Sequence, residues 1–302
     1  MSTSTTAAVP SQAGTAGVSF VGVLKSEWIK FRSLMSTRLL LILALVAVIG
    51  VGAMAAWLRG TVLEQIMQSG GIPRGDGAIA PAAVPMSETA AEHSLPAGFE
   101  IYGVPNAGLQ LGILILGALA VLFISSEFAT GMIRSTFTAV PKRLPAFAAK
   151  AIVLVAVSYV LTIVAAFITF LISIPILKAY GVDMDLQRDG VLRGILLGGL
   201  YVAGVALIGL SMGALLRNSA GGIIILVALF FVMPFATQLL GLVPGEFWQH
   251  VNEYVPSVAG GRMLEIGHRD GFIDPGAGAL IFVGWILLFL IPAVLLLKKR
   301  DV

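Results

Sequence analysis

Cysteine is absent from this chain of 302 residues, so the sequence offers neither a disulfide framework nor a thiolate metal site. Histidine is scarce as well: only His93, His250 and His268 occur, and no two have the four-residue spacing of a helical zinc pair. Charged residues make up 12% of the chain, about half the share of a typical soluble domain. These shortages argue against a metal site and against a water-soluble fold.

Hydrophobic residues, in contrast, make up 58% of the chain, and its mean hydropathy is +0.97. A soluble core of this length would leave too much apolar surface in water, so we expect a bilayer as the solvent. Helices are favoured over strands because lipid cannot satisfy free backbone N–H and C=O groups. Six apolar segments approach the roughly 20 residues that a helix needs to cross the hydrocarbon. The predicted spans are residues 39–58, 108–126, 151–174, 192–215, 219–240 and 278–297.

The distribution of Lys and Arg predicts the orientation of these spans. With the N-terminus in the cytoplasm, the cytoplasmic segments hold twelve basic and three acidic residues, a net charge of +9. The seven basic and thirteen acidic residues that remain of nineteen and sixteen give −6 outside. The predicted fold class is therefore an all-α integral membrane protein with six transmembrane helices and with cytoplasmic N- and C-termini. Residues 1–17 are expected to form a disordered tail and residues 18–302 the membrane domain.

No Asp, Glu, Lys or Arg lies inside the predicted spans away from their ends. Because an ionisable residue within a span is the usual mark of a proton relay or an ion-coupled carrier, its absence argues against a secondary transporter. Any transport would then draw its energy from another source.

Residues 18–37 precede the first span and have helical periodicity. Phe20, Val21, Leu24, Trp28, Phe31 and Met35 fall within an arc of about 100°, whereas Lys25, Lys30 and Arg32 fall outside it. This pattern predicts an amphipathic helix in the membrane interface, with Trp28 at headgroup depth and the basic side chains near anionic lipid. The residues assigned to this interface helix are Trp28, Lys30, Phe31 and Arg32.

A second polar segment, SSEFATGMIRSTFTAVPKR at residues 125–143, separates the second and third spans. Ser125 or Ser126 is expected to cap a new helix, with Glu127 at its positive end. Phe128, Met132 and Phe137 then follow at helix-like spacing until Pro141 ends the segment. Lys142, Arg143 and Lys150 are expected to hold the loop on the cytoplasmic side. The segment thus predicts a short amphipathic helix that faces the cytosol.

Glu127-Phe128-x-x-Gly131-x-Ile133-Arg134, followed by Pro141-x-Arg143, resembles the cytoplasmic loop of ABC-2 type permeases, the membrane subunits of ATP-binding-cassette exporters. The upstream SEWIKFRS, residues 26–33, is similar to the amphipathic segment with which bacterial members begin. The resemblance implies a multi-pass permease of the cell membrane that acts in efflux. The loop would be a coupling helix that docks on a separate ATPase. The residues implied in this coupling are Glu127, Phe128, Gly131, Arg134, Pro141 and Arg143.

The same resemblance places ATP and Mg in the partner ATPase and no cofactor in this chain, which would not itself be an enzyme. The sequence agrees, because it contains no G-x-x-x-x-G-K-[ST] phosphate-binding loop. An ATPase dimer with two half-sites implies two permease subunits, either two copies of this chain or this chain and a sibling. No nucleic-acid partner is expected.

Two other classes compete with a permease. Gly209-Leu210-Ser211-Met212-Gly213 matches the G-x-S-x-G pattern of serine hydrolases, but all three His lie in predicted outer loops, far from Ser211. Helix packing is the simpler explanation for this glycine-rich span, with four-residue pairs at Gly194–Gly198 and Gly209–Gly213. A membrane assembly scaffold that transports nothing fits the bulk composition equally well, and only the loop motif favours a permease.

The two long outer segments differ in composition. Residues 59–107 are rich in Pro, Gly and Ala and predict an irregular loop with little core, whereas residues 241–277 carry aromatics and predict two short helices around a break. For the second segment the family resemblance suggests re-entrant helices, and a partly buried loop is the alternative. The spans carry uncharged polar residues that suggest an amphipathic or lipid-like cargo: Gln110, Ser158, Thr162, Thr169 and Gln238.

Overall fold

A computed structural model describes residues 19–69, 71–73, 79–81, 101–139, 143–187, 190–265 and 273–299. The predicted N-terminal tail lies outside these ranges, as do Pro141, His93 and His268.

The structure confirms an all-α membrane protein, since six helical segments within the described ranges are long and apolar enough to cross a bilayer. Four of them are single helices: α2 (Met35–Ser69), α6 (Arg143–Lys178), α7 (Val191–Leu216) and α12 (Pro275–Lys299). Another consists of a 3₁₀ turn, η1 (Ile101–Asn106), and α4 (Leu109–Ala129). The remaining one joins α8 (Ser219–Val227), η2 (Ala228–Val232) and α9 (Met233–Leu240).

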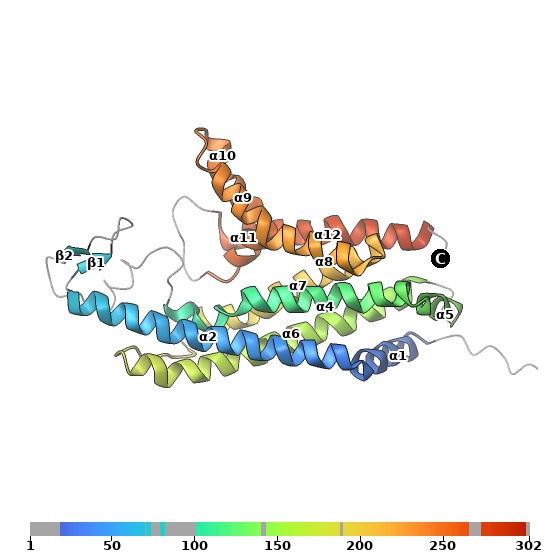
Figure 1. Cartoon of the computed structure of the whole chain (residues 1–302), viewed down its shortest axis with the longest axis horizontal. Helices are drawn as coiled ribbons and strands as arrows, with labels where there is room; N and C mark the ends of the chain where they lie inside the picture. Colours follow the sequence, from blue (N-terminus) through green and yellow to red (C-terminus); the bar gives the residue numbers. More distant parts are fainter. Residues whose placement is uncertain are drawn as a thin grey trace, which may run out of the picture.

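Helix α7 lies at the centre of the bundle and packs against α4, α6, α8 and α12 (Figure 1). The glycines of α7 permit this packing, because a Cβ on Gly209 would lie 2.6 Å from the carbonyl oxygen of Gly117 in α4. A Cβ on Gly213 would lie 2.8 Å from the carbonyl oxygen of Val121. The two backbones therefore approach each other as closely as small residues allow in membrane helices.

Helices α2 and α6 are longer than the predicted spans. Their 35 and 36 residues correspond to roughly 52–54 Å at 1.5 Å per residue, well beyond a hydrocarbon layer of about 30 Å. They pack together at their far ends, where Gly60 leaves no room for a Cβ beside the ring of Tyr180. Residues 59–69 are thus helical, so the prediction of an irregular loop from residue 59 was wrong at its start, because packing on α6 continues the helix.

Other parts of the outer segments form short elements. Strands β1 (Gly71–Pro73) and β2 (Ile79–Pro81) pair antiparallel, with Ile72 opposite Ala80. Residues 241–277 contain the predicted short helices: α10 (Glu246–His250), the 3₁₀ turn η3 (Val251–Tyr254) and α11 (Pro256–Arg262). Helix α11 packs against α12, and Gly260 lies directly on the ring of Tyr201 from α7.

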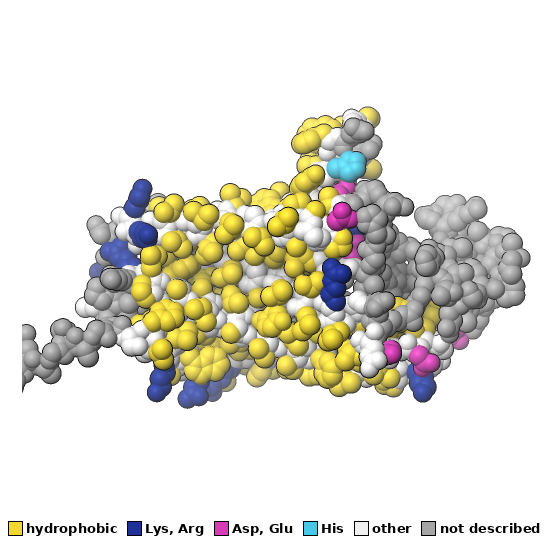
Figure 2. Space-filling view, turned by 180° about the vertical axis from the view of Figure 1, so that it is seen from behind, with side chains coloured by type: hydrophobic (Ala, Val, Ile, Leu, Met, Phe, Trp, Pro, Cys, Tyr) yellow, Lys and Arg dark blue, Asp and Glu magenta, His cyan; other side chains and the backbone are white. Residues whose placement is uncertain are grey.

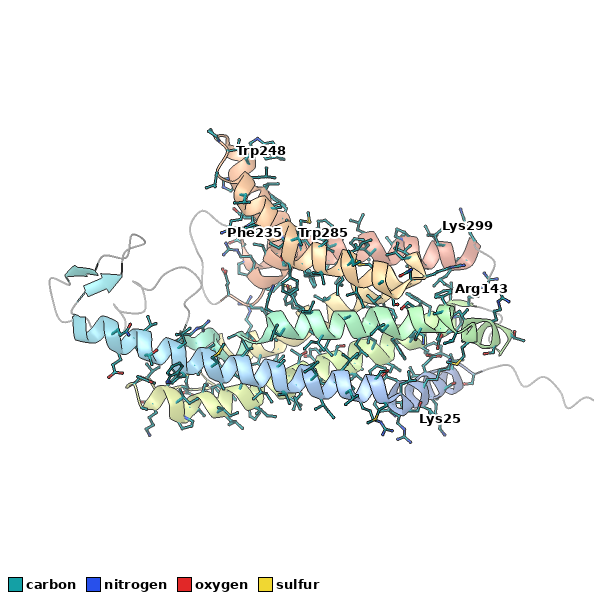
Figure 3. All side chains as sticks on the ribbon, viewed as in Figure 1. Lys25, Arg143, Phe235, Trp248, Trp285 and Lys299 are labelled. Carbon is teal, nitrogen blue, oxygen red and sulfur yellow. The ribbon has the colours of Figure 1, made fainter. Side chains whose placement is uncertain are left out.

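The fifth span bends in its middle, so that α9 and α10 project away from the bundle (Figures 1 and 3). The bend coincides with the π-helical turn η2 and with Pro234, which lacks the N–H that a straight helix would use. Thr237 ties the projecting part to η3, because its hydroxyl lies 2.6 Å from Oδ1 of Asn252. Phe235, at 64% exposed, is one of several apolar side chains on this projecting arm.

Helix α1 (Phe20–Ser33), the short helix α5 (Met132–Ala139) and the C-terminal end of α12 lie at one end of the bundle (Figure 1). Lys25, Arg143 and Lys299 mark this end in Figure 3, and Lys and Arg side chains gather there in Figure 2. The Asp and Glu side chains visible on that face lie toward the other end. We call the end that contains α1, α5 and the C-terminal end of α12 the basic end.

The close contact of α7 with α4 predicts that Gly209→Ala destabilises the bundle by about 1–3 kcal/mol, because the added methyl group forces the two backbones apart. Thermal unfolding of the purified chain in detergent measures this change.

Gly284→Ala in α12 is the matched control, since nothing lies within 4 Å of a Cβ there. Alanine is also the better helix former, so this variant should be as stable as the parent or slightly more so. Equal melting temperatures for both variants would contradict the packing argument.

Candidate functional site

The loop motif begins inside α4 and not at a new helix start. Ser125, Ser126 and Glu127 belong to the last turns of α4, so the prediction that a serine caps a helix here was wrong. The chain turns at Gly131, whose φ of +73° is in the left-handed region that favours glycine, and α5 begins at Met132. Helix α4 thus continues to Ala129, and Glu127 in its last turn pairs with Lys30 and Lys150.

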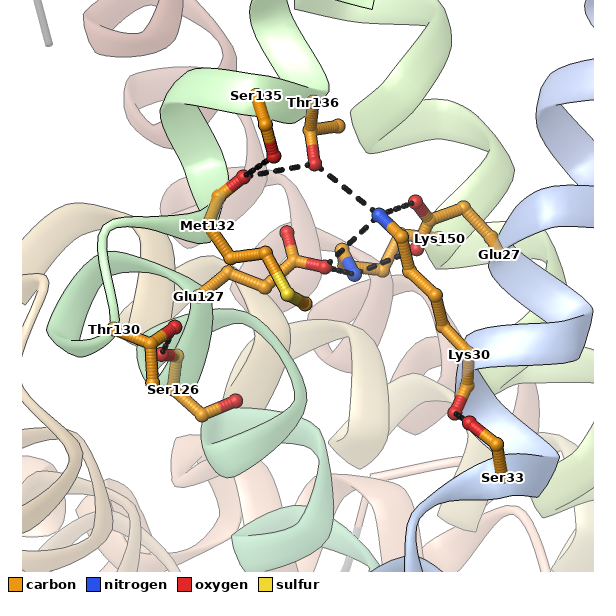
Figure 4. A network of polar contacts seen from close by, with 10 residues as sticks. All are labelled: Glu27, Lys30, Ser33, Ser126, Glu127, Thr130, Met132, Ser135, Thr136 and Lys150. Carbon is orange, nitrogen blue, oxygen red and sulfur yellow. Dashed lines mark hydrogen bonds and ion pairs between the residues drawn. The ribbon is translucent and has the colours of Figure 1, made fainter.

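Four charged side chains from three helices meet at the basic end: Glu27 and Lys30 of α1, Glu127 of α4 and Lys150 of α6 (Figure 4). We call them the four-charge cluster. Nζ of Lys150 lies 2.7 Å from Oε2 of Glu27 and 3.0 Å from Oε1 of Glu127. Nζ of Lys30 lies 2.8 Å from Oε1 of Glu27 and 3.3 Å from Oε1 of Glu127. Each lysine therefore bridges both carboxylates.

The cluster is almost completely removed from solvent. The side chains of Glu27, Lys150 and Glu127 are 2%, 3% and 5% exposed, and only Lys30 reaches the surface, at 25%. Two carboxylates and two ammonium groups balance to zero net charge, which offsets the cost of burying them. Nζ of Lys150 also lies 3.9 Å from the centre of the Phe123 ring, a distance at which the ring face attracts a cation.

Electrostatics favour the charged form of Lys30. Burial opposes its charge, but the hydrogen bond to Glu27 and the attraction of Glu127 outweigh that effect and raise the pKa of Lys30 above its ordinary value. Glu127, in contrast, sits near the negative end of the α4 dipole, where a carboxylate is disfavoured. The two lysines compensate for this position.

The prediction that Lys150 belongs to a cytoplasmic loop was wrong. Helix α6 begins at Arg143, so Lys150 lies two turns inside it and is buried. The charge of Lys150 does not imply exposure to water, because Glu27 of α1 and Glu127 of α4 pair with it inside the protein.

The cluster also reaches α5. Nζ of Lys30 lies 3.2 Å from Oγ1 of Thr136, so a side chain of α1 contacts the short helix directly (Figure 4). Beside it, Phe31 packs edge-on against Phe123 of α4 with ring centres 5.0 Å apart. Helices α1, α4, α5 and α6 are thus joined at a single place.

The predicted coupling residues have different environments. Glu127 is buried, Phe128 is half-buried beneath the guanidinium of Arg217 at 5.0 Å, and Arg134 is exposed on α5. Arg143 donates a hydrogen bond to the carbonyl oxygen of Leu297 at 3.3 Å, which ties the start of α6 to the last turn of α12.

Among the predicted interface residues, Phe31 turns into the bundle, whereas Trp28 is 45% exposed. The side of α1 that faces the protein is formed by Val23, Glu27 and Phe31, spaced four residues apart. Glu27 was not among the predicted site residues, nor was Lys150. The four-residue spacing of Glu27 with two apolar residues was the available signal for its burial.

The described surroundings of Ser211 are those of a packed helix residue. It is buried within α7, and its hydroxyl donates to the carbonyl oxygen of Leu207 at 2.8 Å. His250, the one described histidine, is exposed on α10 of the projecting arm. The hydrolase alternative is therefore not favoured.

Within the described residues, six apolar helical segments pack with the glycine-rich α7 at their centre and with a buried, charged junction at one end, which is the architecture of a multi-pass membrane protein. Residues 43–297 match the family described as ABC-2 family transporter protein, and the chain belongs to this family of ABC transporter membrane proteins. The match includes Glu127 and Lys150 and begins after α1. Among curated proteins, none matches the chain.

Removal of the cation at the centre of the cluster should be costly. We expect Lys150→Met to destabilise the bundle by about 3–5 kcal/mol, because Glu27 keeps only Lys30 as a partner and both carboxylates stay buried. Thermal or denaturant unfolding in detergent measures the loss.

The double variant Glu27→Gln/Lys150→Met removes one charge of each sign and should recover part of that loss. Arg134→Gln is the control, since Arg134 is exposed and should change stability by less than about 0.5 kcal/mol. A Lys150→Met variant as stable as Arg134→Gln would show that the cluster does not hold the helices together.

Proposed function

We propose that this chain is the permease subunit of an ABC-2 type exporter, which moves an amphipathic or lipid-like substrate outward and is driven by a separate ATPase subunit. One observation carries the proposal beyond the family: α5 is a short helix with an exposed outer face, and its Thr136 contacts Lys30 of the four-charge cluster, which links α1, α4 and α6. A helix placed in this way can receive a force from a soluble partner and pass it to several membrane helices.

The docking surface that we propose is the outer face of α5. Met132 is 44% exposed there, and Arg134, Ser135 and Thr138 are exposed as well. Glu127 is too deeply buried to touch a partner, so its proposed role is to position α5 and the end of α4. Gly131 allows the turn between the two helices, and Arg143 fixes the start of the next span.

Coupling would then proceed through the cluster. ATP and Mg bound in the partner ATPase supply the energy, and closure of that ATPase pushes α5. Because Lys30 contacts both Thr136 and Glu127, movement of α5 changes the position of α1 relative to α4. Lys150 transmits the same movement to α6. The helices that line a transport path would thereby tilt together.

The orientation that fits this mechanism places the basic end in the cytoplasm, with both termini on that side. The excess of Lys and Arg at this end supports it, because such residues are retained on the cytoplasmic side. We further propose that a second permease subunit, another copy or a sibling, accompanies the two half-sites of an ATPase dimer.

The substrate class rests on the uncharged character of the spans. Thr162 and Thr169 of α6 are buried and donate their hydroxyls to the backbone of their own helix, to Ser158 and Ala165, so they offer little to a cargo. Gln110 and Gln238 are exposed and remain the polar groups that could contact an amphipathic substrate.

A charge reversal on the exposed face of α5 tests the docking. When the full chain is purified from its native membrane, we expect a stoichiometric ATPase with a phosphate-binding loop, identified by mass spectrometry and by ATP hydrolysis. Arg134→Glu should reduce its recovery about tenfold or more, as expected for loss of a charge pair at an interface centre.

Arg193→Glu is the matched control, because Arg193 is also exposed but lies in the first turn of α7, at the opposite end of the bundle. This variant should keep the ATPase. Recovery of the ATPase with Arg134→Glu at the level of the parent would refute docking on α5. If no ATPase co-purified with the parent chain, the permease proposal would fail and a membrane assembly scaffold would be the remaining function.

A further inference from the structure

A groove of about 300 Å³ opens beside Trp28, where α1 meets the start of α2 and the flank of α6. Its walls are the apolar side chains of Phe31, Leu41 and Val157 together with the ring of Trp28. Arg32 and Arg38 stand at its rim. The groove therefore combines apolar walls with two positively charged side chains.

The two arginines are held near each other by the bend between α1 and α2. Nε of Arg38 donates to the carbonyl oxygen of Arg32 at 2.7 Å, which spans the junction of the two helices. Within the described ranges, no carboxylate pairs with either guanidinium, and no acidic residue lines the groove. The nearby carboxylates Glu27 and Glu127 are already paired with the lysines of the four-charge cluster.

The position of the groove suits a lipid. Exposed apolar side chains of α2 follow Arg38 directly, at Leu39, Ile42 and Leu43, which are 53–59% exposed. The arginines thus stand at the level where the hydrocarbon ends, and the half-exposed Trp28 is typical of the headgroup region. An acyl chain in the groove would continue directly into the bilayer.

We propose that this groove binds one anionic phospholipid of the leaflet at the basic end, with its phosphate on Arg32 and Arg38 and an acyl chain along Leu41 and Val157. Arginine is suited to this contact, because its planar guanidinium donates two parallel hydrogen bonds to phosphate oxygens. The lipid phosphate would neutralise charge at the junction of α1 and α2, where Arg32 and Arg38 have no described carboxylate partner. The proposal concerns lipid binding alone and does not rest on transport.

Native mass spectrometry of the full chain, with any subunit that co-purifies, tests the site. The delipidated protein is mixed with equal amounts of phosphatidylglycerol and phosphatidylcholine that carry the same acyl chains. We expect retained phosphatidylglycerol to exceed phosphatidylcholine, and the preference to fall by about fivefold for each arginine removed in Arg32→Gln and in Arg32→Gln/Arg38→Gln. Arg32→Gln leaves the backbone bond to Arg38 intact.

The matched control is Lys298→Gln/Lys299→Gln, which removes two exposed cations from the same end of the bundle without touching the groove. It should keep the preference, and Val157→Phe, which fills the groove, should lose it. Equal effects of the lysine and arginine pairs would overturn the proposal in favour of a diffuse charge effect. Displacement of the lipid by free glycerol phosphate would overturn it in favour of a simple anion site.

Discussion

The balanced ion pairs among Glu27, Lys30, Glu127 and Lys150 are the constraint on which the basic end of this protein depends. Three of these side chains are nearly inaccessible, so removal of any one leaves an uncompensated charge in an apolar surrounding. The cluster fixes the register of α1 against α4 and α6, and through Thr136 it also fixes α5. The short helix α5 is thereby linked to the ion pairs that join α1, α4 and α6.

The two faces of helix α1 consequently have different environments. Val23, Glu27 and Phe31 face the bundle and are fixed by packing and ion pairs. Lys25 and Arg32 are exposed on the other side of the helix. Arg32 is available to the anionic lipid proposed above, because the described carboxylates Glu27 and Glu127 are paired with Lys30 and Lys150. A change in either environment would alter the balance of forces on the same short helix.

The six spans could be predicted because their signal is local: a run of apolar residues is long enough to cross the bilayer wherever it occurs. The four-charge cluster could not, since Glu27 and Lys150 are 123 residues apart and no local pattern links them. Charged residues were expected to be exposed to water, and this expectation misplaced Lys150 and the start of the short helix. The lengths of α2 and α6 were underestimated for a related reason. Polar residues beyond Leu58 were expected to end the helix, but contact between the two helices stabilises them in helical conformation.

The length of α2 and α6 has a mechanical consequence. Each is a helix of roughly 52–54 Å. Lys150 ties α6 to α1 and α4 near the basic end, and α2 and α6 contact each other near Gly60 and Tyr180 at the far end. A rotation of about 5° at the basic end moves the far end of such a helix by about 4–5 Å. Small displacements at the basic end would in this way be enlarged with distance, and the far ends of the two helices would travel the most.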